Sequence, residues 1–179
     1  RLIRLINDIL DLDKIQAGMM DFKMQPLDLT EIITQSAAAS QGLGDQRGIS
    51  YVFTSSVDKA EVQGDHDRLC QVMANLLSNA TKFSPTGGRV EISISRNGPG
   101  FRVAVTDHGT GISEEFRDTI FDRFTQAEQT DSSRIGGTGL GLSICKSILD
   151  HHQGTIGFKS EVGRGSKFYF DLPERIDPA

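Results

Sequence analysis

Two asparagines and a lysine lie on an otherwise apolar helical pattern. Asn75 and Asn79 are four residues apart and share one helix face, and Lys82 follows three residues later. Amides are costly to bury without partners, because hydrogen-bonding groups are then removed from water. An amide oxygen suits a Mg²⁺ ion that keeps most of its waters and also binds phosphates, and a lysine adds positive charge there. The three residues therefore indicate a site for Mg²⁺ and phosphate, although hydrogen bonding of both amides to backbone or solvent stays open.

Two glycine-rich turns could contact other parts of the same ligand. Asp107-His108-Gly109-Thr110-Gly111 follows an expected strand, and a carboxylate beside glycines suits a planar ligand that carries an amine. Gly136-Gly137-Thr138-Gly139-Leu140-Gly141 runs into an expected helix, whose free N–H groups and dipole favour an anion. Each turn taken alone is also compatible with an ordinary turn. A P-loop is excluded because no Gly-Lys-Ser/Thr follows, and a dinucleotide-binding fold because no βαβ unit surrounds the second turn.

The periodicity of apolar residues predicts the elements that hold these side chains. Helices are expected at residues 2–15, 28–41, 65–82, 114–121 and 140–151. Strands are expected at residues 51–57, 90–96, 101–106, 154–160 and 166–172. Asp28 and Asp65 are the expected N-caps, and Glu31 completes a capping-box pattern with Asp28. Gly42, Gly44 and Gly48 are expected to end the helix that Asp28 begins.

These elements alternate without a regular βαβ repeat. The expected fold class is α/β, a two-layer sandwich in which helices cover one face of a mixed, mainly antiparallel sheet, preceded by an N-terminal helix. The N-terminal helix has a broad apolar stripe, with Leu2 and Ile9, and Leu5 and Leu12, each seven residues apart. Such a helix is expected to pack on a partner helix, although docking on its own domain stays open.

Composition bounds the remaining possibilities. The 179 residues are 37% hydrophobic, enough for one core, and the net charge of −5 with a pI near 5.3 argues against non-specific nucleic-acid binding. Cys70 and Cys145 lie in apolar helical patterns and are expected to be buried, reduced thiols, as in a cytoplasmic protein. No apolar run reaches the ~18 residues of a membrane span, so no membrane contact is expected. Because Arg1 falls within a helical pattern, we expect a longer parent chain, which could carry a membrane anchor.

The order of the motifs resembles that of the catalytic ATP-binding domain of sensor histidine kinases. Within it, Asp67–Pro85 is similar to the asparagine box, Asp107–Ile112 to the first glycine box, Phe121–Phe124 to the phenylalanine box and Gly137–Leu142 to the second glycine box. Gly163–Phe168 resembles the terminal strand motif, and Leu5–Gly18 the second helix of the dimerisation hairpin. The wider superfamily comprises gyrase, Hsp90 chaperones, histidine kinases and mismatch-repair proteins, and its fold is the Bergerat-type ATP-binding sandwich.

The resemblance implies a division of the chain. Residues 1–18 would be the C-terminal part of the dimerisation hairpin, 19–27 a linker, 28–173 the catalytic ATP-binding domain and 174–179 a tail.

The resemblance also implies roles for individual residues. Asp107 would accept a hydrogen bond from the adenine amine, with Ser166 supporting the base through water. Asn79 would bind Mg²⁺, and Asn75 would lie close to the phosphates. The other implied ATP contacts are Lys82, Phe83, Gly109, Gly111, Ile112, Phe124, Gly137, Thr138, Gly139, Leu140 and Gly141.

A lid over the nucleotide is implied for residues 125–136. Phe121 and Phe124 would anchor its base in the core. Gln126 stands where many kinases have an arginine, so Arg134 is the residue expected to supply charge to the transferring phosphoryl group.

The implied activity is histidine kinase phosphotransfer from Mg-ATP in two-component signalling. The acceptor would be a histidine on the dimerisation domain of a homodimeric, cytoplasmic or membrane-anchored parent, and the next partner the receiver domain of a response regulator. None of the four histidines lies in the acceptor motif, so this chain would hold only the donor site. Asn75 replaces the water-activating glutamate of ATP-hydrolysing relatives, which implies negligible ATPase activity. A non-catalytic nucleotide-binding module stays open, whereas Asn75 and the N-terminal helix argue against an ATP-driven clamp.

Overall fold

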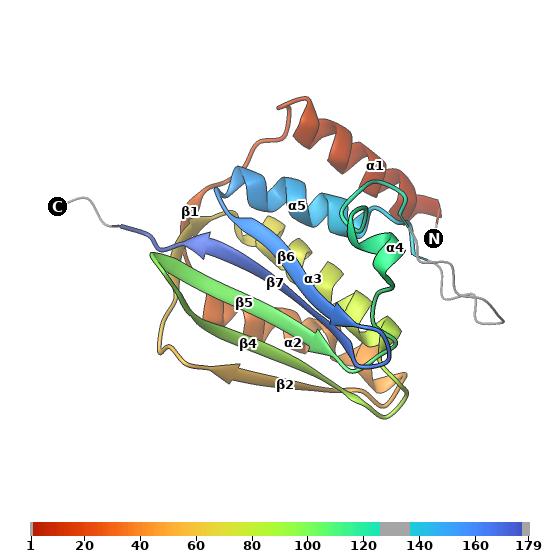
Figure 1. Cartoon of the computed structure of the whole chain (residues 1–179). Helices are drawn as coiled ribbons and strands as arrows, with labels where there is room; N and C mark the ends of the chain where they lie inside the picture. The colour runs from red at the N-terminus through yellow and green to blue at the C-terminus, as the bar shows by residue number, and fades with distance from the viewer. Residues whose placement is uncertain (1, 126–136, 177–179) are drawn as a thin grey trace.

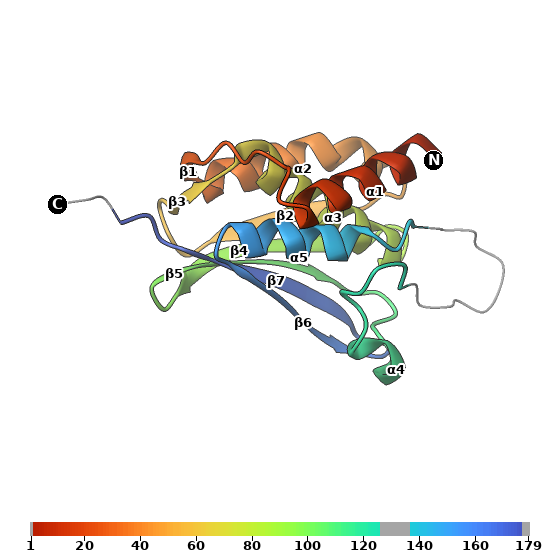
Figure 2. The same cartoon turned by 90° about the horizontal axis from the view of Figure 1, so that it is seen from above.

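Five strands and three helices form two layers in the computed structural model, which describes residues 2–125 and 137–176 (Figures 1 and 2). The sheet order is β2-β4-β5-β7-β6, in which β2 and β4 are parallel and the other neighbours antiparallel. The strands are β2 Ser50–Ser55, β4 Arg89–Asn97, β5 Gly100–Asp107, β6 Thr155–Glu161 and β7 Gly165–Pro173. The helices on one face are α2 Leu29–Asp45, α3 His66–Phe83 and α5 Gly141–His151. The predicted two-layer sandwich with a mixed sheet is confirmed.

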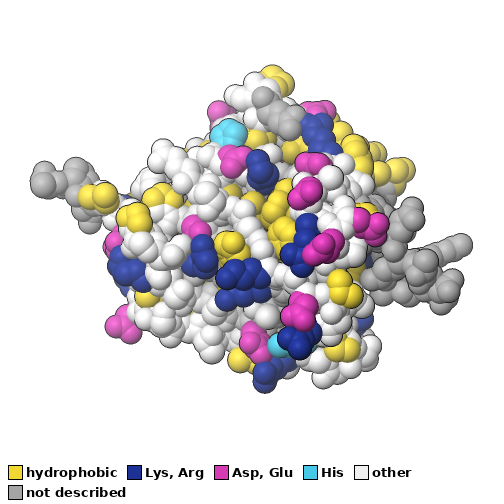
Figure 3. Space-filling model, in the orientation of Figure 1, with side chains coloured by type: hydrophobic (Ala, Val, Ile, Leu, Met, Phe, Trp, Pro, Cys, Tyr) yellow, Lys and Arg dark blue, Asp and Glu magenta, His cyan; other side chains and the backbone are white. Residues whose placement is uncertain are grey.

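The other face of the sheet carries charges of both signs. Figure 3 looks onto this face and shows Lys and Arg side chains interspersed with Asp and Glu. Arg102 illustrates the pairing, since its guanidinium donates two hydrogen bonds of 2.7 Å to Asp171 and lies over the Tyr169 ring. Such pairing balances the charge of this face rather than concentrating positive charge on it.

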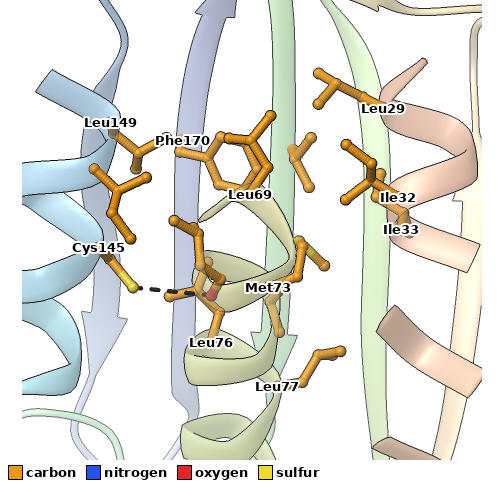
Figure 4. Close-up of a cluster of buried hydrophobic side chains, with 14 of the residues drawn as sticks. Leu29, Ile32, Ile33, Leu69, Met73, Leu76, Leu77, Cys145, Leu149 and Phe170 are labelled. Atoms are coloured by element: carbon orange, nitrogen blue, oxygen red, sulfur yellow. Dashed lines mark hydrogen bonds between the residues drawn. The ribbon is translucent and has the colours of Figure 1, made fainter. Parts of the chain in front are cut away.

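The core is built around α3 (Figure 4). Leu69, Met73, Leu76 and Leu77 are buried between α2 on one side and α5 on the other, above the sheet. The apolar positions of α3 therefore match the helical period read from the sequence.

One of the two cysteines belongs to this core. The Cys145 thiol donates to the Val72 carbonyl at 3.8 Å, and its burial raises its pKa to about 12, so it is a neutral thiol (Figure 4). Both cysteines are free, but Cys70 is only half-buried, with Sγ 3.9 Å from Nε2 of His66. The prediction of a buried thiol is thus confirmed for Cys145 and wrong for Cys70, which is partly exposed.

The second helix continues past two of the glycines that were expected to end it. α2 reaches Asp45, so Gly42 and Gly44 are inside the helix. A Cβ on Gly44 would lie 2.8 Å from the Ile49 carbonyl and 3.0 Å from the Tyr51 ring. Gly44 is therefore required for the close approach of β2 to α2, rather than as a helix terminator.

A two-stranded sheet was missing from the sequence prediction. β1 (Gln25–Asp28) pairs antiparallel with β3 (Glu61–Gly64), at a distance along the chain that no local pattern reveals. The Asp28 cap reinforces this pairing, because its carboxylate accepts from the backbone N–H groups of Thr30 at 2.9 Å and Ala60 at 3.1 Å.

The predicted helix at 114–121 is shorter than expected. α4 ends at Arg117, after which the chain turns so that Phe121 packs edge-on against Phe158.

The N-terminal helix docks on the sandwich. α1 (Leu2–Gln16) packs along α5, where Leu12 and Ile15 are 2% and 3% exposed (Figures 1 and 2). Leu2 and Ile3, by contrast, are 70% and 75% exposed. One face of α1 therefore docks on its own domain, which was the alternative left open. The exposed apolar residues of α1, Leu2, Ile3, Ile6 and Leu10, form a stripe that no described residue covers. No helix within the described ranges is both long and apolar enough to span a membrane.

The Asp65 cap connects α3 to the segment that follows α1. Its carboxylate accepts from the backbone N–H groups of Arg68 at 3.1 Å and Lys23 at 2.7 Å. Burial raises the pKa of Asp65, but these hydrogen bonds outweigh that effect, so its pKa lies below the ordinary value of 3.8. The stabilisation by the ionised cap is therefore complete above about pH 4 and is lost as the pH falls through the lower pKa of the folded state.

We expect Asp65→Ala to lower the free energy of unfolding by about 1–3 kcal/mol, because α3 loses its cap and the Lys23 N–H loses its acceptor. Urea denaturation at pH 7 measures this difference. Asp67→Ala is the matched control, since its side chain is 92% exposed on the same helical turn and should change stability by less than about 0.5 kcal/mol. Equal effects of the two substitutions would contradict the role of Asp65.

Candidate functional site

The polar face of α3 forms one wall of the candidate site. The Asn75 amide donates to the Gly141 carbonyl at 3.2 Å and to the Cys145 sulfur at 3.7 Å, which joins α3 to the first turn of α5. Asn79, one turn further along, is half-buried, and its side chain makes no hydrogen bond to any residue that the structure describes. Asn75 is therefore already engaged in the protein, whereas the Asn79 oxygen is available to a ligand.

The second glycine turn lies against the end of this face. A Cβ on Gly137 would lie 3.6 Å from Nζ of Lys82, so the ammonium group is close to the backbone of the turn. A Cβ on Gly139, which has φ of +72°, would lie 2.8 Å from Cα of Phe124. Thr138 caps the turn, because its hydroxyl accepts from the Leu140 N–H at 3.3 Å. The lysine and the N-terminus of α5 together form an electropositive region suited to phosphates.

The first glycine turn forms the opposite wall. Asp107 ends β5, is 4% exposed, and accepts from the Gly109 N–H at 2.9 Å. Burial raises the pKa of this carboxyl, and hydrogen bonds from the Gly109 and Ser166 backbones oppose the shift. A Cβ on Gly109 would lie 2.1 Å from the Phe83 carbonyl, which places the end of α3 directly against this turn.

Ser166 lies directly beside Asp107, on the neighbouring strand β7. The two residues are register partners on β7 and β5, and Ser166 is 8% exposed. Directly opposed residues of an antiparallel pair project on the same side of the sheet. Asp107 and Ser166 thus present neighbouring oxygen atoms at the end of the sheet where the first glycine turn begins.

The structure brings most of the predicted residues together, with exceptions. Phe124 is 61% exposed with φ of +62°, so the prediction that it anchors a lid base in the core is wrong. Its backbone N–H donates to the Gly139 carbonyl at 2.8 Å, so its backbone is tied to the second glycine turn while its side chain faces solvent. Leu140 is fully buried, and Ile112 is 9% exposed, so the side chains of both lie mainly in the protein interior. Of the lid expected at 125–136, residues 126–136, which include Gln126 and Arg134, lie outside the described residues.

Three contacts around the site had no signal in the sequence. Arg47, beyond the end of α2, donates to the Lys82 carbonyl at 2.6 Å and to the Ser84 carbonyl at 3.0 Å, and so fixes the end of α3. The Ser160 hydroxyl on β6 contacts both the first glycine turn and Ser166. Asp8 of α1 accepts from the Thr138 hydroxyl at 3.1 Å, which brings the N-terminal helix to the rim of the second glycine turn.

The donor set fits a Mg²⁺ ion that is also held by phosphates. The described residues contain no group of three or more His, Cys, Asp or Glu side chains that could hold a metal ion. A half-buried amide oxygen at Asn79 supplies one oxygen ligand, which is typical of Mg²⁺ completed by waters and phosphate oxygens. The site therefore suits a Mg²⁺ ion whose other ligands are waters and phosphate oxygens.

Comparisons with known proteins agree with this geometry. Residues 64–176 match the family described as histidine kinase-, DNA gyrase B- and HSP90-like ATPase. The sensor-like histidine kinase SenX3 of Mycolicibacterium smegmatis is 34% identical over 178 residues, which are 99% of this chain and 46% of that protein.

Solved structures show the same likeness. Full-length ShkA in complex with AMPPNP superposes with a TM-score of 0.85 and 29% identity, over 99% of this chain and 37% of that one. Histidine kinase ThkA in complex with the response regulator protein TrrA gives a TM-score of 0.77 and 25% identity, over 97% of this chain and 48% of that one. The chain thus spans less than half the length of each of these relatives. It belongs to the family of histidine kinase-, DNA gyrase B- and HSP90-like ATPases, as a catalytic ATP-binding domain of the sensor histidine kinase type.

Proposed function

We propose that this chain is the phosphoryl-donor part of a histidine kinase, which binds Mg-ATP and passes the γ-phosphoryl group to a histidine on a dimerisation domain. The observation that carries the proposal is the pairing of two unlike subsites. Buried Asp107 lies at one end, and half-buried Asn79 with Lys82 and the N-terminus of α5 lies at the other. The first suits an amine-bearing base and the second suits phosphates with Mg²⁺.

Each residue has a role in this proposal. Asp107 accepts from the adenine amine, and Ser166 supports the base. Asn79 ligates Mg²⁺, and Lys82 contributes charge to the phosphates. The glycine turns allow close backbone approach, and Thr138 offers its hydroxyl at the phosphate end. Mg²⁺ supplies charge neutralisation on the phosphate oxygens when bound. Arg134 is retained as the proposed source of additional charge on the transferring group.

The transfer step itself is a displacement at phosphorus. The unprotonated nitrogen of the acceptor imidazole attacks the γ-phosphorus, and the bond to the bridging oxygen breaks, so ADP leaves with that electron pair. The other ring nitrogen then releases its proton to water. Asn75 cannot take a proton from water, and its amide is held by Gly141 and Cys145. This arrangement favours retention of the γ-phosphoryl group until an acceptor histidine arrives.

The N-terminal helix points to the source of the acceptor. We propose that α1 belongs to a dimerisation hairpin, followed by the linker at 19–27, because the exposed stripe of α1 needs a further apolar partner. None of the four histidines of the chain has the acceptor context, so the acceptor would lie elsewhere in a homodimeric parent. The ThkA–TrrA complex supports a response regulator as the next partner, and a cytoplasmic location would supply ATP.

We expect the chain alone to release phosphate from ATP at a negligible rate, and to label a supplied acceptor hairpin with γ-phosphate. Mixing the chain, the matching hairpin and γ-labelled ATP should give acid-labile, base-stable phosphate on the hairpin within minutes. A hairpin whose histidine is replaced by glutamine is the control and should stay unlabelled. ATP binding without labelling would favour a non-catalytic nucleotide-binding module, and steady turnover without the hairpin would favour an ATP-driven clamp.

A further inference from the structure

A row of three polar side chains crosses the sheet at the base subsite. Asp107 on β5 is the register partner of Ser166 on β7, and Ser166 is the register partner of Ser160 on β6. The Ser160 hydroxyl has three partners. It lies 2.8 Å from the Ile112 N–H, 2.9 Å from the Gly165 carbonyl and 2.9 Å from the Ser166 hydroxyl.

Only one arrangement of hydrogens turns all three contacts into hydrogen bonds. The backbone N–H of Ile112 can only donate, and the carbonyl of Gly165 can only accept. Ser160 has a single hydrogen, which therefore points at the Gly165 carbonyl. The remaining contact is satisfied only if the Ser166 hydroxyl donates to Ser160. Both lone pairs of the Ser160 oxygen are then occupied, by Ile112 and Ser166.

This arrangement fixes the direction of the hydroxyl hydrogen of Ser166. Its hydrogen is directed away from the base subsite toward β6, so the Ser166 oxygen can only accept on the side that faces a ligand. Asp107 beside it is also an acceptor, with one carboxylate oxygen already bound to the Gly109 N–H. Two neighbouring acceptors favour a base that carries an amine and disfavour one that carries a carbonyl oxygen at the same position.

We propose that Ser160 is a positioning residue for base selection, because it orients the Ser166 hydroxyl so that the subsite accepts the six-amino group of adenine and rejects a six-oxo purine. Ser160 acts through Ser166 and does not itself touch the nucleotide. The inference rests on the proposed nucleotide site and adds to it a cause of specificity.

The surroundings hold Ser160 in place. The Arg117 guanidinium, at the end of α4, donates to the Ser160 backbone carbonyl. The neighbouring backbones leave little room to shift, since a Cβ on Gly111 would lie 2.2 Å from the Glu161 carbonyl. The position of the Ser160 oxygen is therefore set by the packing of the glycine turn against β6, which is the condition for a fixed hydroxyl orientation.

The test is nucleotide selectivity in Ser160→Ala. Dissociation constants are measured for ATP and for inosine triphosphate, which has a carbonyl oxygen where adenine has its amine. Without Ser160, the Ser166 hydroxyl is free to rotate and donate to that carbonyl. We expect the preference for ATP over inosine triphosphate to fall about tenfold, with ATP affinity changed by less than about threefold. Ser160→Thr keeps the hydroxyl and should restore the preference.

A double-mutant cycle separates orientation from structural damage. If Ser160 acts through Ser166, Ser160→Ala should not change the selectivity further in a Ser166→Ala background. An equal loss of affinity for both nucleotides, an unchanged preference, or additive effects in the cycle would each overturn the proposal. If Ser160→Ala does not fold, the wild-type chain is compared with Ser166→Ala and Ser160→Thr instead. Ser166→Ala must then lower the preference for ATP over inosine triphosphate, and Ser160→Thr must keep it. Failure of the proposed nucleotide site would differ, since the wild-type chain would then bind neither nucleotide. Failure of phosphotransfer alone would leave both dissociation constants measurable.

Discussion

Gly165→Ala is expected to lower the free energy of unfolding by about 3–5 kcal/mol and to abolish nucleotide binding. Gly165 begins β7 with φ of +103°, a conformation that alanine adopts only with strain. A Cβ there would lie 2.1 Å from the Asp107 carbonyl and 2.8 Å from Cα of His108. Both atoms belong to the backbone at the end of β5, so relief requires the two strands to separate where Asp107 meets Ser166.

Gly163 provides the matched control for this prediction. It has φ of +81° in the same turn, yet a Cβ there would meet no atom within 4 Å. Gly163→Ala should therefore add only backbone strain, about 1–2 kcal/mol, and should leave ATP binding intact. Denaturant unfolding and ATP titration of the two variants measure the difference. If Gly165→Ala destabilised the protein no more than Gly163→Ala does, the close approach of β7 to the Asp107 backbone would be refuted.

Asp107→Asn is expected to weaken ATP binding about 100-fold while leaving the fold intact. The substitution preserves shape, and the amide oxygen can still accept from the Gly109 N–H. The other carboxylate oxygen becomes an NH₂ group, which places a donor against the donors of the adenine amine. In a site where Asp107 is 4% exposed, water cannot relieve that mismatch.

Tripolyphosphate separates base recognition from a general disturbance of the site. It occupies the phosphate end only, so its affinity should be the same for the wild-type chain and Asp107→Asn. Isothermal titration of ATP and tripolyphosphate with both proteins gives the comparison. A parallel loss for the two ligands would mean that Asp107 maintains the structure of the first glycine turn instead of recognising the base.

Short-range signals explain which parts of the molecule could be predicted. The amphipathic period of α3 and its Asp65 cap are encoded within one helix, so its bounds were predicted to within one or two residues. The position of Asp107 between a strand and a glycine turn is equally local. Gly44 shows the limit of such reasoning. From the sequence alone this glycine is expected to end the helix, and only the packing of β2 against it shows that the helix continues.

The site shows the same division. Asn79, Asp107 and Lys82 could be identified from residue type and spacing, since the chemistry of Mg²⁺, phosphate and an amine-bearing base requires these groups. Phe124 could not be placed correctly, because its backbone is positioned by a contact with Gly139 in another segment, which the local sequence does not encode. The docking of α1 on α5 was equally undetermined, since an apolar stripe specifies that a partner is needed but not which one.

The class of fold, the identity of the polar groups and the lack of the acceptor motif could all be read from the residues in order, because periodicity, caps and motif spacing act over a few residues. The tertiary structure alone decided which groups meet. It joined β1 to β3, brought Arg47 to the end of α3 and aligned Asp107, Ser166 and Ser160 in one row across three strands. Such alignments depend on register between distant strands, and register is fixed by the packing of the whole sheet against its helices rather than by any local pattern.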